Sequence, residues 1–135
     1  MKKIIIFLFI AVSLHSLEWL TYEEAVNRSK KSCKPIMLVV YSSQCQACAS
    51  LYKKIDASNL IKNVLEDYEL SKISVNEALE KHDTSISRTP TIFLLSSNKE
   101  ELLKPVEGVP MEILDFLEYL QVGIIANDNV KCKAK

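Results

Sequence analysis

Short apolar runs alternate along this chain with stretches whose apolar residues recur every three or four positions. An unbroken apolar run at 36–41 is typical of a strand buried on both faces. The elements predicted in chain order are helix 22–31, strand 36–41, helix 46–55, helix 58–66, strand 73–75, helix 77–82, strand 91–95, strand 102–106 and a final helix with Ile113, Leu114, Leu117 and Leu120 on one face. This order predicts an α/β fold in which helices cover both faces of a central four-stranded sheet.

Capping residues indicate where the folded part begins and ends. Thr21 followed by Glu24 forms a capping box at the start of the first helix, and Pro110 stands where a first-turn proline of the last helix is expected. The chain after Gln121 is polar and is expected to be loose. We therefore expect one domain at 17–121 and a polar C-terminal tail at 122–135.

The N-terminus has the pattern of a secretory signal peptide. Basic residues at positions 2 and 3 precede an apolar run at 4–12 and small residues at Ser13 and Ser16. The run is shorter than the ~20 residues that cross a bilayer, although an uncleaved membrane anchor is the alternative interpretation. No cysteine follows the run closely, which argues against a lipid-anchored protein. We expect residues 1–16 to be removed on export to the periplasm or another compartment outside the cytoplasm.

The charge balance gives no reason to expect a nucleic-acid partner. The whole chain has 17 basic and 17 acidic residues, and loss of Lys2 and Lys3 leaves 15 basic residues (17 − 2). About 120 residues remain after processing, enough for one domain with one core. We expect a monomer.

Cys45 and Cys48 carry the main candidate chemistry. A C-x-x-C pair between a buried strand and a helix start is typical of a dithiol redox centre, because the helix N-terminus favours the thiolate. Zinc sites use the same spacing but need further Cys or His ligands, usually as a second close pair. Cys33 and Cys132 stand far apart and His82 has no neighbouring ligand, so the sequence favours redox chemistry without a metal or an organic cofactor.

These features together resemble the thioredoxin family. The strand–C-x-x-C–helix unit, Thr89-Pro90-Thr91 before a later strand, and Gly108 after the last strand match its pattern between about Trp19 and Leu120. The segment from Trp19 to Leu38 is also similar to the C-terminal domain of exported thiol-disulfide interchange proteins. The resemblance implies a thioredoxin-like fold with a mixed central sheet and an activity that exchanges disulfides with protein cysteines.

The resemblance also implies roles for individual residues. Cys45 is expected to be the solvent-facing nucleophile, and Cys48 the resolving thiol one helical turn inward. Thr89-Pro90 matches the family's cis-proline element, which lies against the active-site disulfide and pairs with the substrate backbone. The implied partners are exported proteins with cysteines and a membrane-bound or soluble thiol-disulfide electron donor.

The chain departs from the thioredoxin pattern at three places. Val39 stands where the family has a buried acid, Gln44 replaces the tryptophan before the first cysteine, and the spacer is Gln46-Ala47. A spacer without proline or histidine lacks the mark of strong exported oxidants, so reduction of substrate disulfides is favoured. Glu69 or Glu77 could supply the missing carboxylate, but solvated surface roles are the preferred interpretation for both.

Several other residues are expected to have structural or surface roles. Trp19, Tyr22 and Phe116 are predicted to pack in the core, Lys81 and His82 to lie at a solvated helix end, and Arg88 to lie on the surface near the active site.

Cys33 and Cys132 have two possible interpretations. In the implied fold both cysteines lie at the pole opposite the active site. A disulfide between them, closing a loop of about 100 residues, is therefore geometrically possible. The alternative is a half-buried Cys33 beside a disordered Cys132. For the whole protein, a dithiol carrier of Cu or Zn and a non-catalytic interaction module remain the alternatives to an oxidoreductase.

Overall fold

The computed structural model describes residues 17–82, 86–110, 112–130 and 132. The predicted signal peptide lies outside the described residues. The elements in chain order are β1 (Trp19–Leu20), α1 (Tyr22–Ser32), β2 (Ile36–Tyr41), α2 (Gln46–Ala57), α3 (Asn59–Leu65), β3 (Glu69–Ser74), α4 (Val75–His82), β4 (Thr91–Leu95), β5 (Val106–Glu107) and α5 (Ile113–Asp128).

The strands form one mixed sheet in the order β1-β3-β2-β4-β5. Strands β1, β3 and β2 are parallel, whereas β4 and β5 run antiparallel to their neighbours. The mixed α/β class is as predicted, but the sheet in the described chain has five strands and not four. The additional strand is β1, which pairs with β3 through Leu70 and Ser71.

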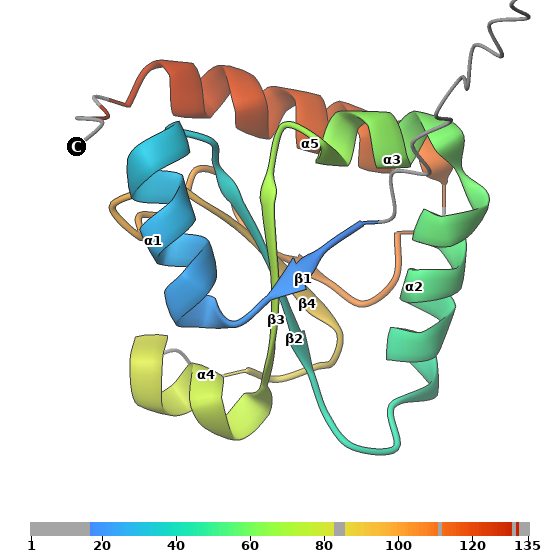
Figure 1. Cartoon of the computed structure of the whole chain (residues 1–135). Helices are drawn as coiled ribbons and strands as arrows, with labels where there is room; N and C mark the ends of the chain where they lie inside the picture. The colour runs from blue at the N-terminus through green and yellow to red at the C-terminus, as the bar shows by residue number, and fades with distance from the viewer. Residues whose placement is uncertain (1–16, 83–85, 111, 131, 133–135) are drawn as a thin grey trace, which may run out of the picture.

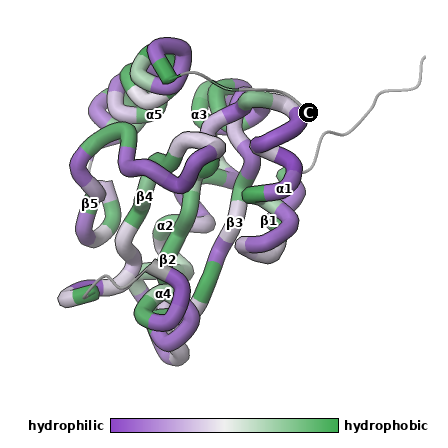
Figure 2. The backbone as a smooth tube through the Cα atoms, turned by 90° about the vertical axis from the view of Figure 1, so that its left-hand side faces the viewer, coloured by the Kyte–Doolittle hydropathy of each residue, from purple (hydrophilic) through white to green (hydrophobic). Residues whose placement is uncertain are grey.

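Helices cover both faces of the sheet, with α1 and α4 on one side and α2, α3 and α5 on the other (Figure 1). Because side chains alternate along a strand, Met37 and Val39 of β2 face α2, α3 and α5, while Leu38 and Val40 face α1 and α4. All four side chains are at most 1% exposed. Figure 2 shows the apolar colour concentrated along the central strands β2 and β4.

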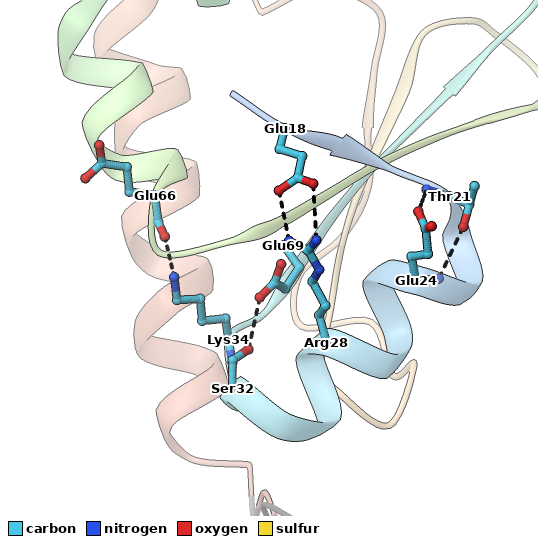
Figure 3. A network of polar contacts seen from close by, with 8 residues as sticks. All are labelled: Glu18, Thr21, Glu24, Arg28, Ser32, Lys34, Glu66 and Glu69. Atoms are coloured by element: carbon cyan, nitrogen blue, oxygen red, sulfur yellow. Dashed lines mark hydrogen bonds and ion pairs between the residues drawn. The ribbon is translucent and has the colours of Figure 1, made fainter. Parts of the chain in front are cut away.

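Polar contacts tie α1 to the parallel edge of the sheet (Figure 3). Arg28 donates to both carboxylate oxygens of Glu18 at 2.9 and 3.1 Å, and the Ser32 hydroxyl donates to Glu69 at 3.1 Å. The capping box predicted for α1 is present, since Thr21 and Glu24 exchange both hydrogen bonds. These contacts join α1 to the chain just before β1 and to the first residue of β3.

The C-terminal third of the fold corrects three predictions. Strand β5 covers only Val106–Glu107 and not 102–106, because the chain bends at Leu102 and Leu103 directly after an isolated bridge between Glu101 and Leu95. Helix α5 continues to Asp128, so residues 122–128 of the predicted loose tail are helical. Its N-cap is Glu112, which places Pro110 before the helix and not in its first turn.

A disulfide closes the fold at the pole opposite the β2–α2 turn. The ends of α1 and α5 lie side by side there (Figure 1), and Cys33 is bonded to Cys132 with a Cα–Cα distance of 5.7 Å. The Asn127 side chain also donates to the Cys33 carbonyl at 2.9 Å. Of the two interpretations of these cysteines, the structure therefore has the bridge. No helix in the described part of the chain is both long and apolar enough to cross a membrane.

Candidate active site

Cys45 and Cys48 lie at the carboxyl end of β2, where the chain turns into α2. Gln44 adopts a left-handed conformation with φ of 62°, which directs the chain from the strand into the helix. Cys45 is the N-cap of α2, and its sulfur accepts a hydrogen bond from the Cys48 N–H at 3.1 Å. The two sulfur atoms are bonded to each other, with the Cα atoms 5.2 Å apart.

The two cysteines differ in their access to solvent. Cys45 is partly exposed, while Cys48 is only 4% exposed and packs in the core. The unpaired N–H groups in the first turn of α2 point toward Cys45 and favour negative charge on its sulfur. Cys45 is thus placed for attack on an external sulfur, and Cys48 for attack on Cys45.

Thr89 and Pro90 directly precede β4, and Thr89 contacts the dithiol. The Thr89–Pro90 peptide bond is cis, and Pro90 is buried. The Thr89 hydroxyl lies 3.5 Å from the Cys45 sulfur and 2.9 Å from the Ser42 hydroxyl. The Pro90 carbonyl accepts a hydrogen bond from the Gly108 N–H at 2.7 Å, which ties this segment to the chain after β5. The sequence pattern had singled out all of these residues except Ser42.

An open cleft of about 640 Å³ lies beside the dithiol, on the side of α2 and β3. We call it the dithiol cleft. Its lining residues are Tyr41, Ser42, Gln44, Cys45, Gln46, Cys48, Ala49, Tyr52 and Lys72. Neither Thr89 nor Pro90 lines it, so the cleft and the proline element flank Cys45 separately.

Lys72 and Tyr52 are site residues that the sequence pattern did not indicate. The Lys72 ammonium lies 5.3 Å from the centre of the Tyr52 ring and 5.9 Å from that of Trp19, and the two rings meet edge to face. Burial and the neighbouring Tyr41 raise the pKa of Tyr52 to about 12. Tyr52 therefore keeps its hydroxyl proton at neutral pH.

The position that carries an acid in thioredoxins is fully apolar here. Val39 is completely buried among the side chains of α2 and the sheet. Glu69 accepts a hydrogen bond from Ser32 instead, and Glu77 is exposed on α4. Neither belongs to the dithiol cleft, whose lining contains no carboxylate in the described chain.

The remaining candidates lie outside the dithiol cleft or serve packing. Trp19, Tyr22 and Phe116 pack against or within the core, as expected. Arg88 is exposed beside Gly108. Lys81 is not simply solvated: it forms an ion pair with Glu23 and lies over the Tyr22 ring. Among the described residues, no group of three or more His, Cys, Asp or Glu side chains is placed to hold a metal ion.

Several solved structures share this fold. A thioredoxin from Thermus thermophilus superposes with a TM-score of 0.64 at 21% identity, covering 79% of this chain and 86% of its own. A structure titled DsbH oxidoreductase superposes with a TM-score of 0.64 at 18% identity, and the match covers 82% of this chain and 86% of that structure. The periplasmic thioredoxin SoxS from Paracoccus pantotrophus, in its reduced form, superposes with a TM-score of 0.53 at 18% identity. The match covers 68% of this chain and 99% of SoxS. At these identities the likenesses establish the fold.

A comparison with curated proteins gives no match. A family model described as thioredoxin-like, however, matches residues 18–97, which is more than half of the chain and includes the dithiol and Thr89-Pro90. The chain belongs to the thioredoxin-like family.

Proposed function

We propose that this protein is an exported thiol-disulfide oxidoreductase that reduces disulfides of other exported proteins through Cys45 and Cys48. The observation that carries the proposal is the position of the dithiol. A partly exposed sulfur caps the N-terminus of α2, a buried sulfur lies one turn behind it, and Thr89 contacts the exposed one. This arrangement separates an attacking thiolate from a resolving thiol.

The reaction consists of two thiol-disulfide exchanges. In the reduced protein, the Cys45 thiolate attacks one sulfur of a substrate disulfide, and the substrate's other sulfur leaves as a thiolate. The Cys48 thiolate then attacks Cys45 in the mixed disulfide and releases the second substrate thiolate. The protein loses two electrons and the substrate gains them, and solvent protonates the released thiolates. A thiol-disulfide electron donor reverses the two steps to restore the dithiol.

Thr89 and Ser42 support the first step. The Thr89 hydroxyl can donate to the Cys45 sulfur, and the Ser42 hydroxyl contacts Thr89 on its other side. A hydrogen bond to the thiolate stabilises it relative to the thiol. The family resemblance assigns pairing with the substrate backbone to Thr89-Pro90, and the Thr89 contact supports that assignment.

Three observations support export. The N-terminal sequence has a basic start, an apolar run and small residues. The Cys33–Cys132 bridge lies away from the dithiol and is of the kind that persists outside the reducing cytoplasm. One of the similar solved structures is described as a periplasmic thioredoxin.

The direction of electron flow is tested by a redox titration against glutathione. A midpoint potential of about −270 mV, that of thioredoxin, supports a reductase, whereas a potential of about −120 mV indicates an oxidant. A Cys48→Ser variant should trap mixed disulfides on Cys45, and Cys45→Ser should trap none. Failure of Cys45 and Cys48 to form a reversible disulfide would refute the proposal.

A further inference from the structure

The dithiol cleft has a single charged side chain in its lining. While Cys45 is part of a disulfide, including the mixed disulfide with substrate, the other lining residues are neutral and the Lys72 ammonium gives the cleft a net positive charge next to the sulfur atoms. In the described chain Lys72 makes no ion pair, and the contacts of its ammonium are with two aromatic rings. This charge is therefore available to a ligand.

The structure holds this ammonium at the cleft. Lys72 is on β3, directly opposite Val39 of β2 in the parallel register, and its side chain extends over Tyr52 and Trp19. Cation–π contacts favour this position without neutralising the charge. A carboxylate at the position of Val39 would neutralise the charge of Lys72, but Val39 is apolar.

The Tyr52 hydroxyl is a second recognition group. Tyr52 lines the dithiol cleft, and its hydroxyl is buried without a hydrogen-bond partner among the described residues. A buried hydroxyl without a partner is unfavourable, so a ligand acceptor that displaces the atoms covering the Tyr52 hydroxyl gains this hydrogen bond. The amide side chains of Gln44 and Gln46 add further neutral donors to the lining.

One cation with several neutral donors matches one carboxylate. The geometry points to the dithiol cleft as a specificity site for an Asp or Glu side chain that lies next to the reacting cysteine of the substrate polypeptide. This inference rests on the proposed function and names a substrate feature for it. The aromatic rings of Tyr41 and Tyr52 suit the aliphatic stem of such a side chain, while its carboxylate meets Lys72 and the Tyr52 hydroxyl.

The position of Cys45 restricts which substrate residue can occupy the cleft. Cys45 itself lines the cleft, so a group bound there is close to the mixed disulfide. Consecutive residues of an extended chain are about 3.3–3.6 Å apart along the strand. The acid must therefore be an immediate or next neighbour of the substrate cysteine, and not a distant charge.

Four peptides provide the test, and three of them differ from the reference Gln peptide in one residue each. Every peptide contains one cysteine disulfide-bonded to a fluorescent thiol. In the first three, the residue after the cysteine is Glu, Gln or Lys. In the fourth peptide Gln follows the cysteine and the Glu is moved to the far end. We expect kcat/KM for reduction to be about three- to tenfold higher for the adjacent Glu than for Gln, the effect of one charge-assisted contact. The distant Glu should behave as Gln.

Variants assign this preference to Lys72. Lys72→Gln should make the Glu and Gln peptides equal, and Lys72→Glu should favour the Lys peptide. Tyr52→Phe should reduce the preference for Glu while keeping its sign. Lys53→Gln is the control for loss of a positive charge, because Lys53 is an exposed lysine on α2, the helix of Tyr52, but does not line the cleft. It should keep the full preference.

The possible outcomes separate this inference from the proposed function. Reduction of all peptides at equal rates, a preference that survives in Lys72→Gln, or an equal effect of the distant Glu would overturn the inference and leave the oxidoreductase proposal intact. If the protein reduces none of the peptides and has no reversible dithiol, the proposed function fails and the inference fails with it. If a Lys72 variant does not fold, the comparison of peptides on the unmodified protein still tests the preference for an adjacent acid, since equal rates overturn the inference.

Discussion

The backbone N–H of Cys48 donates a hydrogen bond of 3.1 Å to the sulfur of Cys45. The sulfur thus takes the place that a Ser, Thr or Asp oxygen has at an ordinary helix N-cap. A thiolate accepts this bond better than a thiol does, and the first turn of α2 contains no acidic residue to oppose the negative charge. We therefore expect the two cysteines of the reduced protein to differ in reactivity before any substrate is bound.

This difference predicts the order of alkylation. In the fully reduced protein at neutral pH, iodoacetamide should modify Cys45 at least about tenfold faster than Cys48, which is buried. Mass spectrometry of peptides from a time course measures both rates. Equal rates, or faster modification of Cys48, would contradict the assignment of Cys45 as the nucleophile.

The Thr89 hydroxyl predicts a rate effect without a large effect on stability. Thr89→Val keeps the shape of the side chain but removes the contacts with Cys45 and Ser42. We expect the reaction of Cys45 with a model disulfide to slow by about five- to tenfold, since one hydrogen bond to a charged group is lost. Ser42→Ala is the control, because it leaves the contact between Thr89 and Cys45 in place and should have the smaller effect. A Thr89→Val rate within experimental error of the unmodified protein would rule out this role.

The strands that could be predicted from the sequence have their own apolar runs. The expected strands at 36–41 and 91–95 coincide with β2 and β4. Strands β1 and β5 have two residues each, too few for any periodicity to show. They exist because of their partners in the sheet, and this information is not local.

The site could be predicted where one segment carries it. The C-x-x-C spacing identifies Cys45 and Cys48 without any tertiary information. Lys72 could not be found in this way, because its role depends on Trp19 from β1 and Tyr52 from α2. In the sequence it is one more charged residue, directly before the strand expected at 73–75.

Gly123 lies in the part of α5 that continues beyond Gln121, and it leads to a third prediction. A glycine inside an apolar segment usually weakens a helix, yet α5 continues through it. A Cβ at this position would lie 2.5 Å from the Leu94 side chain and 2.5 Å from the Tyr68 hydroxyl. The glycine allows α5 to approach the sheet closely.

Gly123→Ala should therefore destabilise the protein despite the better helix propensity of alanine. We expect the free energy of unfolding to fall by about 1–3 kcal/mol, as for other overpacked cores. Urea denaturation measures this, with Gln121→Ala at an exposed position of the same helix as the control, expected within about 0.5 kcal/mol of the unmodified protein. Stabilisation by Gly123→Ala would show that the helix does not approach the sheet so closely.

The buried tyrosines predict a loss of stability at alkaline pH. Burial, with smaller contributions from Tyr119 and Asp67, raises the pKa of Tyr68, whose hydroxyl donates to the Leu120 carbonyl. In the unfolded chain a tyrosine loses its proton above about pH 10, while the folded protein retains it. Stability is therefore complete below this pH and falls as the pH rises further, by about 1.4 kcal/mol per pH unit for each such tyrosine.

Tyr68→Phe should make this decline less steep. The variant loses about 1 kcal/mol at neutral pH with the hydrogen bond to Leu120, and its disadvantage should shrink as the pH rises above about 10. Urea denaturation of both proteins across this range is the measurement. Parallel pH profiles of the two proteins would show that Tyr68 does not contribute to the alkaline transition.

The Cys33–Cys132 bridge predicts a separation of stability from activity. The bond joins residues 99 positions apart, so its removal frees a large loop in the unfolded chain. The double variant Cys33→Ser, Cys132→Ser should lose about 2–5 kcal/mol of unfolding free energy, as found when native disulfides are removed from small secreted domains. Both proteins must be compared with the Cys45–Cys48 disulfide formed, so that only one bond differs.

The Asn127 contact with the Cys33 carbonyl does not involve either sulfur and should keep α5 docked on α1 in the folded variant. Because the bridge and the dithiol lie at opposite poles of the sheet, the exchange rate of Cys45 should stay unchanged. An altered rate would indicate that the bridge also shapes the active site, and two free thiols in the air-oxidised protein would show that the bond does not form.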